Sequence, residues 1–186
     1  MTAAFAFAIA VTLLLFAPGP SNAVLATAGA ESGRRPVWSL LLAELLAYLL
    51  SIMVSRLVLL PLIDFYPPVG TAVKIAIAIY LIYAGWRLWQ SHAVNTSGSL
   101  VDWRQIFATT ALNPKGLLLA IGIFPQNEPL LAAYFAGFAA LVLLSGLTWF
   151  YIGRTLARLA GSRAALLPRL GASVLFGFAV YIAGTA

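Results

Sequence analysis

The chain has 186 residues, of which 62% are hydrophobic and 9% are charged, and its mean hydropathy is +0.98. Soluble globular domains carry about 25% charged residues, because their surfaces must be hydrated. This composition excludes a soluble domain and predicts a polytopic membrane protein of the all-α class, with the lipid bilayer as its solvent. The sequence contains no cysteine and one histidine, His92, so disulfides, thiolate metal sites and histidine-rich metal centres are excluded.

Six apolar runs long enough to cross a bilayer follow one another along the chain, separated by short polar breaks. In chain order the runs are Ala3–Ala30, Val37–Leu60, Val69–Trp89, Gln105–Phe124, Leu130–Ile152 and Ala165–Ala186. No soluble domain or low-complexity tail separates them. The sequence therefore predicts six transmembrane helices in a single transmembrane domain that covers residues 1–186.

Basic residues gather at alternate ends of these predicted helices. The first, third and fifth breaks, with the helix ends beside them, contain Arg34, Arg35, Arg87, Arg104, Arg154, Arg158, Arg163 and Arg169. The second and fourth breaks contain Asp64 and Glu128, with only Arg56 close by. Because cytoplasmic loops are rich in Lys and Arg, the first set is predicted to face the cytoplasm and both termini the opposite side. The net charge of +6 then reflects attraction to an anionic leaflet, and no nucleic-acid partner is expected.

Two further sequence patterns occur at the arginine-rich ends of the predicted helices. Amphipathic rings prefer the membrane interface, and four tryptophans are expected there: Trp38, Trp86, Trp89 and Trp103. The segment Gly153–Arg169 interleaves arginine with leucine, as in a helix that lies on the membrane surface. We interpret this segment as an orientation anchor, with a lipid-sensing or gating element as the alternative.

The two halves of the chain resemble each other at matched places. Phe16–Asn22 in the first segment and Ala111–Gly116 in the fourth both contain proline, glycine and asparagine. Each half holds three segments, an odd number, so the second half must enter the membrane from the opposite side. The sequence therefore predicts two inverted-topology repeats, about 1–93 and 94–186.

The matched prolines predict that the first and fourth helices are broken. The first segment contains Pro18-Gly19-Pro20 followed by Asn22, and the fourth contains Asn113-Pro114. A proline inside a helix removes a backbone hydrogen bond, and hydrocarbon offers no water to replace it. Interrupted segments at corresponding places in two halves are typical of a central transport site. The alternative is that these prolines only kink their helices.

Glu44 and Lys115 are ionisable residues within predicted membrane segments. Such residues cost about 2.5–3.5 kcal/mol each at a helix centre, so both are expected to face a shared cavity. Glu44 is interpreted as a proton carrier or as the counter-ion of a substrate ammonium group, and the alternative is a glutamate that reaches headgroup water. Lys115 is interpreted as a fixed cation for a substrate carboxylate, and the alternative is a structural pair with a glutamate or a carbonyl.

For several other residues a structural role explains the sequence as well as a functional role does. Tyr48 and Tyr80 are candidates for lining the transport path, but tyrosine is also common packing material. Arg56 and Lys74 lie near outer helix ends, where snorkelling to the interface explains them. Small residues four apart permit close helix approach, within the chain or in a homo-oligomer, at Ala132, Ala136 and Ala140.

Several short motifs follow one another across the whole chain. They are Pro18-Gly19-Pro20 with Asn22, Gly33-Arg34-Arg35, Lys74 with Tyr80-Leu81 and Tyr83-Ala84-Gly85, Leu112-Asn113-Pro114-Lys115, Phe124-Pro125-Gln126 and Arg169-Leu170-Gly171. In this order and spacing they resemble the LysE/RhtB family of amino-acid exporters. The resemblance implies a six-helix transporter of the bacterial cytoplasmic (inner) membrane that exports amino acids or related metabolites, driven by proton entry.

One departure from the family pattern concerns the acidic residue. The family often carries Gly-Asp in the second segment, where this chain has Ala43-Glu44. The acidic group is kept, but its longer side chain and the loss of the glycine bear on the size of the substrate.

The leading hypothesis is a secondary exporter, an antiporter of a small zwitterionic or cationic metabolite against protons. It needs no cofactor and is not an enzyme, because no catalytic constellation can be assembled within the segments. One alternative is an exporter of a metal or inorganic cation, which would need more ligands than Glu44 alone. A second alternative is a non-transporting membrane scaffold.

Overall fold

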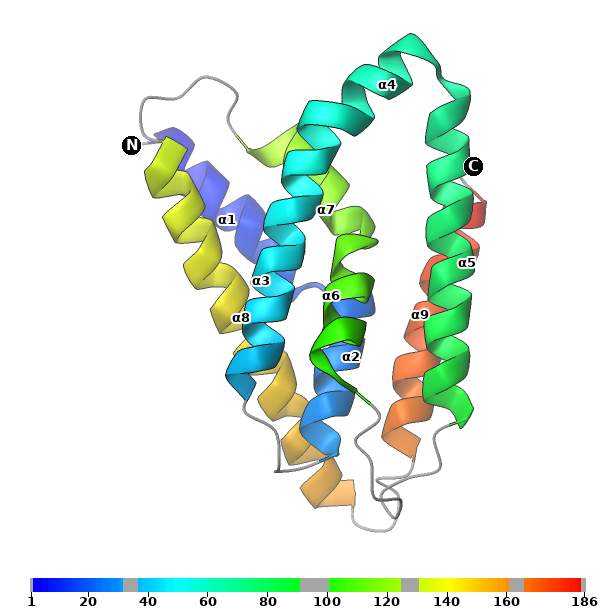
Figure 1. Cartoon of the computed structure of the whole chain (residues 1–186). Coiled ribbons are helices and arrows are strands. Elements are labelled where there is room, and N and C mark those ends of the chain that lie inside the picture. Colours follow the sequence, from blue (N-terminus) through cyan, green and yellow to red (C-terminus); the bar gives the residue numbers. More distant parts are fainter. Residues whose placement is uncertain (1, 32–36, 91–100, 125–130, 161–165, 185–186) are drawn as a thin grey trace.

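The computed structural model describes residues 2–31, 37–90, 101–124, 131–160 and 166–184, and all regular structure in these ranges is helical (Figure 1). The α-helices are α1 (Thr2–Phe16), α2 (Pro20–Ala30), α3 (Val37–Val54), α4 (Leu60–Phe65), α5 (Pro68–Gln90), α6 (Trp103–Ala111), α7 (Pro114–Leu118), α8 (Leu131–Ala160) and α9 (Leu167–Ala183). Two π-helical turns extend α3 and α7, namely η1 (Ser55–Leu59) and η2 (Leu119–Ile123).

The length and composition of these helices make the chain a multi-pass membrane protein. Three helical stretches are long and apolar enough to cross a bilayer: Val37–Phe65, Pro68–Gln90 and Leu131–Leu159. The pair α1 and α2 forms a fourth if the two helices, bent by 57° at their junction, are counted as one span. The all-α prediction is confirmed at this level. The arrangement of six transmembrane helices in two inverted repeats goes further and stays a prediction, as do the domain limits.

Two predicted boundaries were wrong. The second segment does not end at Leu60 but continues through the π-helical turn η1 and through α4 to Phe65, with Pro61 directly after η1. Over the range Gly153–Arg169, where a surface helix was expected, α8 continues to Ala160, and residues 161–165 lie outside the described residues. Gly153 is buried against α2, which keeps this part of α8 in the helix bundle.

The helices pair in a pattern that a two-fold relation between the halves would produce. α2 of the first segment packs mainly on α8 of the fifth, and α6 of the fourth packs mainly on α3 of the second. The third and sixth segments, α5 and α9, pack on each other along one side of the molecule (Figure 1). α1 and α7 occupy the half of the molecule where the termini lie, while α2 and α6 occupy the other half. Both helix breaks therefore lie at middle height.

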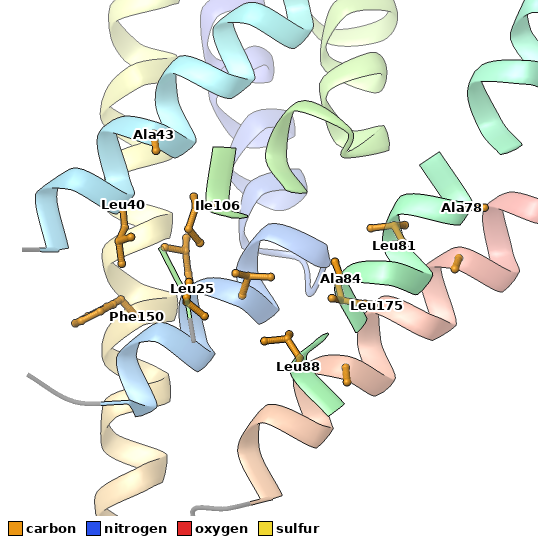
Figure 2. Close-up of a cluster of buried hydrophobic side chains, with 14 of the residues drawn as sticks. Leu25, Leu40, Ala43, Ala78, Leu81, Ala84, Leu88, Ile106, Phe150 and Leu175 are labelled. Atoms are coloured by element: carbon orange, nitrogen blue, oxygen red, sulfur yellow. The ribbon is translucent and has the colours of Figure 1, made fainter. Parts of the chain in front are cut away.

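Two apolar clusters fill the interior, one in each half. The first cluster includes Val24, Leu40, Ile106 and Phe150, with residues of α5 and α9 (Figure 2). The second cluster is rich in aromatic rings and includes Phe7, Leu15, Ile52, Leu119 and Phe138.

A layer of buried polar side chains separates these two clusters. In chain order its members are Ser21, Asn22, Glu44, Thr109, Thr110, Asn113, Lys115 and Ser145. On every segment that carries a residue of this layer, the polar residues lie along the chain between a residue of the first cluster and a residue of the second. On the second segment, for example, Glu44 lies between Leu40 of the first cluster and Ile52 of the second. The fold thus holds a polar layer at the height of the two helix breaks.

The ends of the helices differ in character. The expected interfacial tryptophans Trp38, Trp86, Trp89 and Trp103 are all exposed. They lie on the ends of α3, α5 and α6 that Figure 1 shows together, opposite the termini. Arg87, Arg104, Arg154 and Arg158 belong to the same end, whereas Arg34, Arg35 and Arg163 lie outside the described residues. Which side of the membrane this end faces stays a prediction.

The small residues of α8 face outward. Ala132, Ala136 and Ala140 are all exposed, so this stripe does not form an internal packing surface. Its use in a homo-oligomer stays a prediction.

The crossing of α2 and α8 is closer than side chains would allow. A Cβ atom added to Gly153 would overlap the backbone carbonyl of Ala26, and one added to Gly29 would overlap the carbonyl of Phe150. Glycines of this kind let two membrane helices approach backbone to backbone. The crossing holds the first segment against the fifth.

We expect Gly153→Ala to destabilise the fold by about 1–3 kcal/mol, the usual cost of overpacking, because the added methyl group must push α2 away. Gly137→Ala is the matched control on the same helix, since a Cβ at Gly137 meets nothing within 4 Å. That substitution should leave stability unchanged or raise it by up to about 1 kcal/mol, through helix propensity. Thermal unfolding of the purified variants in detergent measures both effects, and equal midpoints would contradict the close crossing.

Candidate functional site

The first helix break removes backbone donors from the end of α1. Pro18 and Pro20 have no N–H, so the carbonyls of Leu14 and Phe16 lose the donors that a continuous helix would give them. α1 ends at Phe16, and α2 begins at Pro20 after Gly19, whose backbone is extended at φ −171° and ψ 177°. The chain therefore leaves α1 with several carbonyl oxygens at its end to be satisfied.

Side chains from three segments bind two other carbonyls at this end of α1, those of Leu15 and Ala17. Asn22 Nδ2 donates to the carbonyls of Leu15 at 2.9 Å and Ala17 at 2.7 Å. Ser145 Oγ of α8 donates to Leu15 O at 3.0 Å, and Lys115 Nζ of α7 donates to Ala17 O at 2.6 Å. Open carbonyls at membrane depth are tolerated only where such partners exist. The break is thus held by α2, α7 and α8 together.

The second helix break is capped locally and joined to the first. Asn113 is the N-cap of α7, and its Oδ1 accepts from Lys115 N at 3.1 Å. Asn113 Nδ2 also donates to Ser21 Oγ at 2.9 Å, and Thr110 Oγ1 donates to the same oxygen at 2.9 Å. The hydroxyl of Ser21 therefore links the two breaks directly.

Lys115 lies in the interior, with 4% of its surface exposed. A Cβ atom on Gly19 would lie 2.8 Å from Lys115 Cε and 3.0 Å from Nζ, so glycine leaves room for the ammonium group. The bond to Ala17 O is the lysine–carbonyl pair considered as an alternative from the sequence. An ammonium group carries three N–H donors, so this bond leaves donors for a second partner.

Glu44 is also buried, with 2% of its surface exposed, so the alternative that it reaches headgroup water was wrong. Its Oε2 atom has no hydrogen-bond partner among the described residues. Gly146 of α8 faces this atom, because a Cβ there would lie 2.5 Å from it. The charges of Glu44 and Lys115 act on each other, yet within the described ranges no ion pair joins them. A carboxylate in such surroundings is costly unless something neutralises it.

The two candidate tyrosines are in different surroundings. Tyr48 is buried, its ring packs edge-on against Phe138 at 6.0 Å, and its hydroxyl faces Ser21 without reaching hydrogen-bonding geometry. Tyr80 shares a hydrogen bond of 3.0 Å with Thr109 and so ties α5 to α6. Tyr48 thus borders the polar layer, whereas Tyr80 reaches it from the peripheral pair of helices.

A cavity of about 150 Å³ opens beside the first break. Pro18, Gly19 and Asn22 form its inner wall, and residues of α8 and α9 complete it. Glu44 and Lys115 do not line this cavity, and the expectation that they face a shared cavity stays a prediction. Lys115 lies instead directly behind Gly19.

Arg56 plays a role that the sequence analysis missed. Its Nε donates to Ala120 O at 3.0 Å and its Nη2 to Phe124 O at 2.5 Å, with the Phe124 ring 6.0 Å away. The residue at position 125 is proline, which has no N–H to offer the π-helical turn before it. Arg56 supplies donors there, so snorkelling does not account for it. The nearby proline was the only signal in the sequence.

Three more members of the polar layer were missed, namely Ser21, Thr110 and Ser145. Ser21 stands within the Pro-Ser-Asn stretch, which was a usable signal, but nothing local marks the other two.

The described part of the chain offers no metal centre. Within it, no three His, Cys, Asp or Glu side chains come together as a metal site would require. This arrangement gives no support to the alternative of a metal or inorganic cation as cargo.

Comparison with known proteins gives one match. The family model for the LysE type translocator matches residues 12–185, which include both helix breaks, Glu44 and Lys115. No curated protein matches the chain, and no solved structure does.

We expect Arg56→Met to lower stability by about 2–4 kcal/mol, because two buried carbonyls lose a charged donor. Arg56→Lys keeps a charged donor but not the planar guanidinium group that reaches both carbonyls, so its loss of stability should be intermediate. Arg104→Met is the control, since Arg104 is exposed and lies over Trp103 at 5.4 Å. Chemical denaturation followed by circular dichroism gives the three values. A loss no larger for Arg56→Met than for Arg104→Met would show that those carbonyls do not depend on Arg56.

Proposed function

Because the chain belongs to the LysE type translocator family, we propose that it is a secondary active exporter of amino acids or related small metabolites, coupled to proton entry. The family is one of transporters rather than enzymes. The observation that carries the proposal is the carboxyl group of Glu44, buried against Gly146 of α8, with an Oε2 atom that has no hydrogen-bond partner among the described residues.

Glu44 is the proton-coupling residue in this proposal. An ionised carboxylate at this depth requires a proton, a cation or a change of surroundings. A proton that enters from outside would neutralise it in one state, and departure of the proton would leave a charge for the Lys115 ammonium to balance. The burial of both residues in the polar layer supports such an exchange.

The two breaks would bind the polar end of the cargo. Lys115 holds an ammonium group beside Gly19, where α2 begins, and N-terminal helix ends favour negative charge. A cargo carboxylate at Lys115 would compete with Ala17 O for the ammonium donors. Asn22 and Asn113 would keep the broken ends in shape while the cargo is bound.

Transport would follow from rocking of the two halves about this layer. The chain would lie in a bacterial cytoplasmic membrane with its arginine-rich end toward the cytoplasm and both termini outside. In this proposal residues 1–186 form one transmembrane domain. The halves would move about the hydrogen bonds that Ser21 accepts from Thr110 and Asn113.

The test uses purified protein in liposomes loaded with an amino-acid mixture. We expect wild-type efflux to accelerate when the outside is made acidic and to slow when an ionophore collapses the gradient. Glu44→Gln should lose this acceleration, with efflux down at least about tenfold, because the amide cannot exchange a proton. Asp64→Asn is the matched control, since Asp64 lies in α4, outside the polar layer.

Lys115→Met tests the cargo-binding role. It should weaken cargo binding and lower efflux, because the cargo carboxylate loses its cation. Normal efflux by both Glu44→Gln and Lys115→Met would contradict the proposal, and absence of any amino-acid efflux from the wild type would favour the scaffold alternative.

A further inference from the structure

We infer that the cavity between α2, α8 and α9 is the pocket for the cargo side chain, and that it selects neutral amino acids with short apolar side chains. This inference rests on the proposed function and specifies its substrate class. It narrows the earlier expectation of a zwitterionic or cationic cargo.

The cavity is continuous with the first helix break. Pro18, Gly19 and Asn22 belong to the break and form one wall, while Trp149 and Val174 belong to the walls from α8 and α9. The Lys115 ammonium lies behind Gly19. A cargo whose carboxylate reached Lys115 past Gly19 would place its side chain beside these walls. This continuity favours an amino acid over an unrelated occupant such as a lipid chain.

The size of the cavity limits the cargo. Its volume of about 150 Å³ corresponds to about five water molecules at about 30 Å³ each. Two walls are fixed by close contacts. Gly153 is pressed against the Ala26 carbonyl, and a Cβ on Gly171 would lie 2.9 Å from Thr27 Oγ1. The space therefore suits a short aliphatic side chain rather than a large or long one.

The chemistry of the walls excludes charged side chains. None of the residues that line the cavity carries a charge. Asn22 Nδ2 already donates to two carbonyls, and Thr27 Oγ1 donates to Ala23 O at 2.9 Å. Trp149 offers its ring, since its Nε1 atom is buried. A buried charge without a partner costs several kcal/mol.

The charge of Lys115 also bears on which cargo is selected. The Lys115 side chain lies against Gly19, which belongs to the cavity wall. It attracts a carboxylate and repels the ammonium or guanidinium of a basic side chain. Lysine and arginine are thus disfavoured both by repulsion and by the lack of an acidic partner in the walls.

The first experiment compares cargoes in the reconstituted full chain. Vesicles of phosphatidylethanolamine and phosphatidylglycerol are loaded with labelled valine, and unlabelled valine, leucine, lysine or glutamate competes for efflux. We expect valine to compete at least about tenfold better than lysine or glutamate, a discrimination of about 1.4 kcal/mol or more. Equal competition by lysine would overturn the inference while leaving the exporter proposal intact.

Substitutions at Val174 change the pocket in two ways. Val174→Asp places an acid in the wall and should admit lysine, whereas Val174→Asn, of the same size but neutral, should not. Val174→Ala enlarges the pocket and should shift preference toward leucine and phenylalanine. Val180→Ala is the control for the last change, because Val180 lies on the same helix with 74% of its surface exposed. Unchanged preference in folded Val174→Ala protein would overturn the inference.

Tryptophan fluorescence reports binding without transport. Valine should change the emission of detergent-solubilised wild type, and Trp149→Phe should remove that change. Valine binding without efflux would support the pocket and count against the exporter. No fluorescence response and no efflux would overturn both. A response to added phospholipid but to no amino acid would assign the pocket to an acyl chain and overturn the inference.

Discussion

The carbonyl oxygens released at the end of α1 are the constraint on which the polar layer depends. In hydrocarbon each unpaired carbonyl costs several kcal/mol, on the order of a lost hydrogen bond in an apolar solvent. Donors to Leu15 O and Ala17 O come from α2, α7 and α8, so these three helices must keep their positions for the break to exist. The same need recurs at Ala120 and Phe124, where Arg56 is the donor.

Within that layer, most polar groups serve the fold and Glu44 does not. Asn22, Ser145 and Lys115 donate to carbonyls, and Ser21 accepts from the second break. Glu44 makes no comparable bond with any described residue. A buried ionisable group that contributes nothing to the local network is a candidate for exchange of protons or ions, because selection for stability alone would replace it.

The sequence predicted the elements better than their contacts. Run length and hydropathy predicted the helical stretches that are long enough to span a membrane, and prolines located both helix breaks, because these properties are local. The bond from Lys115 to Ala17 O was not predictable, since it depends on how two distant breaks face each other. Likewise, the end of α8 was misjudged because Gly153 meets its partner Ala26 on another helix. The inverted repeats stay a prediction, because the fourth and sixth segments are short or interrupted in the structure.

The two apolar clusters also determine what the polar layer can conduct. One cluster closes it toward the termini with packed rings, including Phe7, Phe124 and Phe138, and the other closes it toward the arginine-rich end. Both clusters are mostly apolar, so a continuous file of water molecules through the protein would require both to open at once. If the proposed transport takes place, opening the two clusters one at a time would let a bound solute pass without an open path for protons. The packing of the two clusters would then limit proton leakage, whatever the identity of the transported solute.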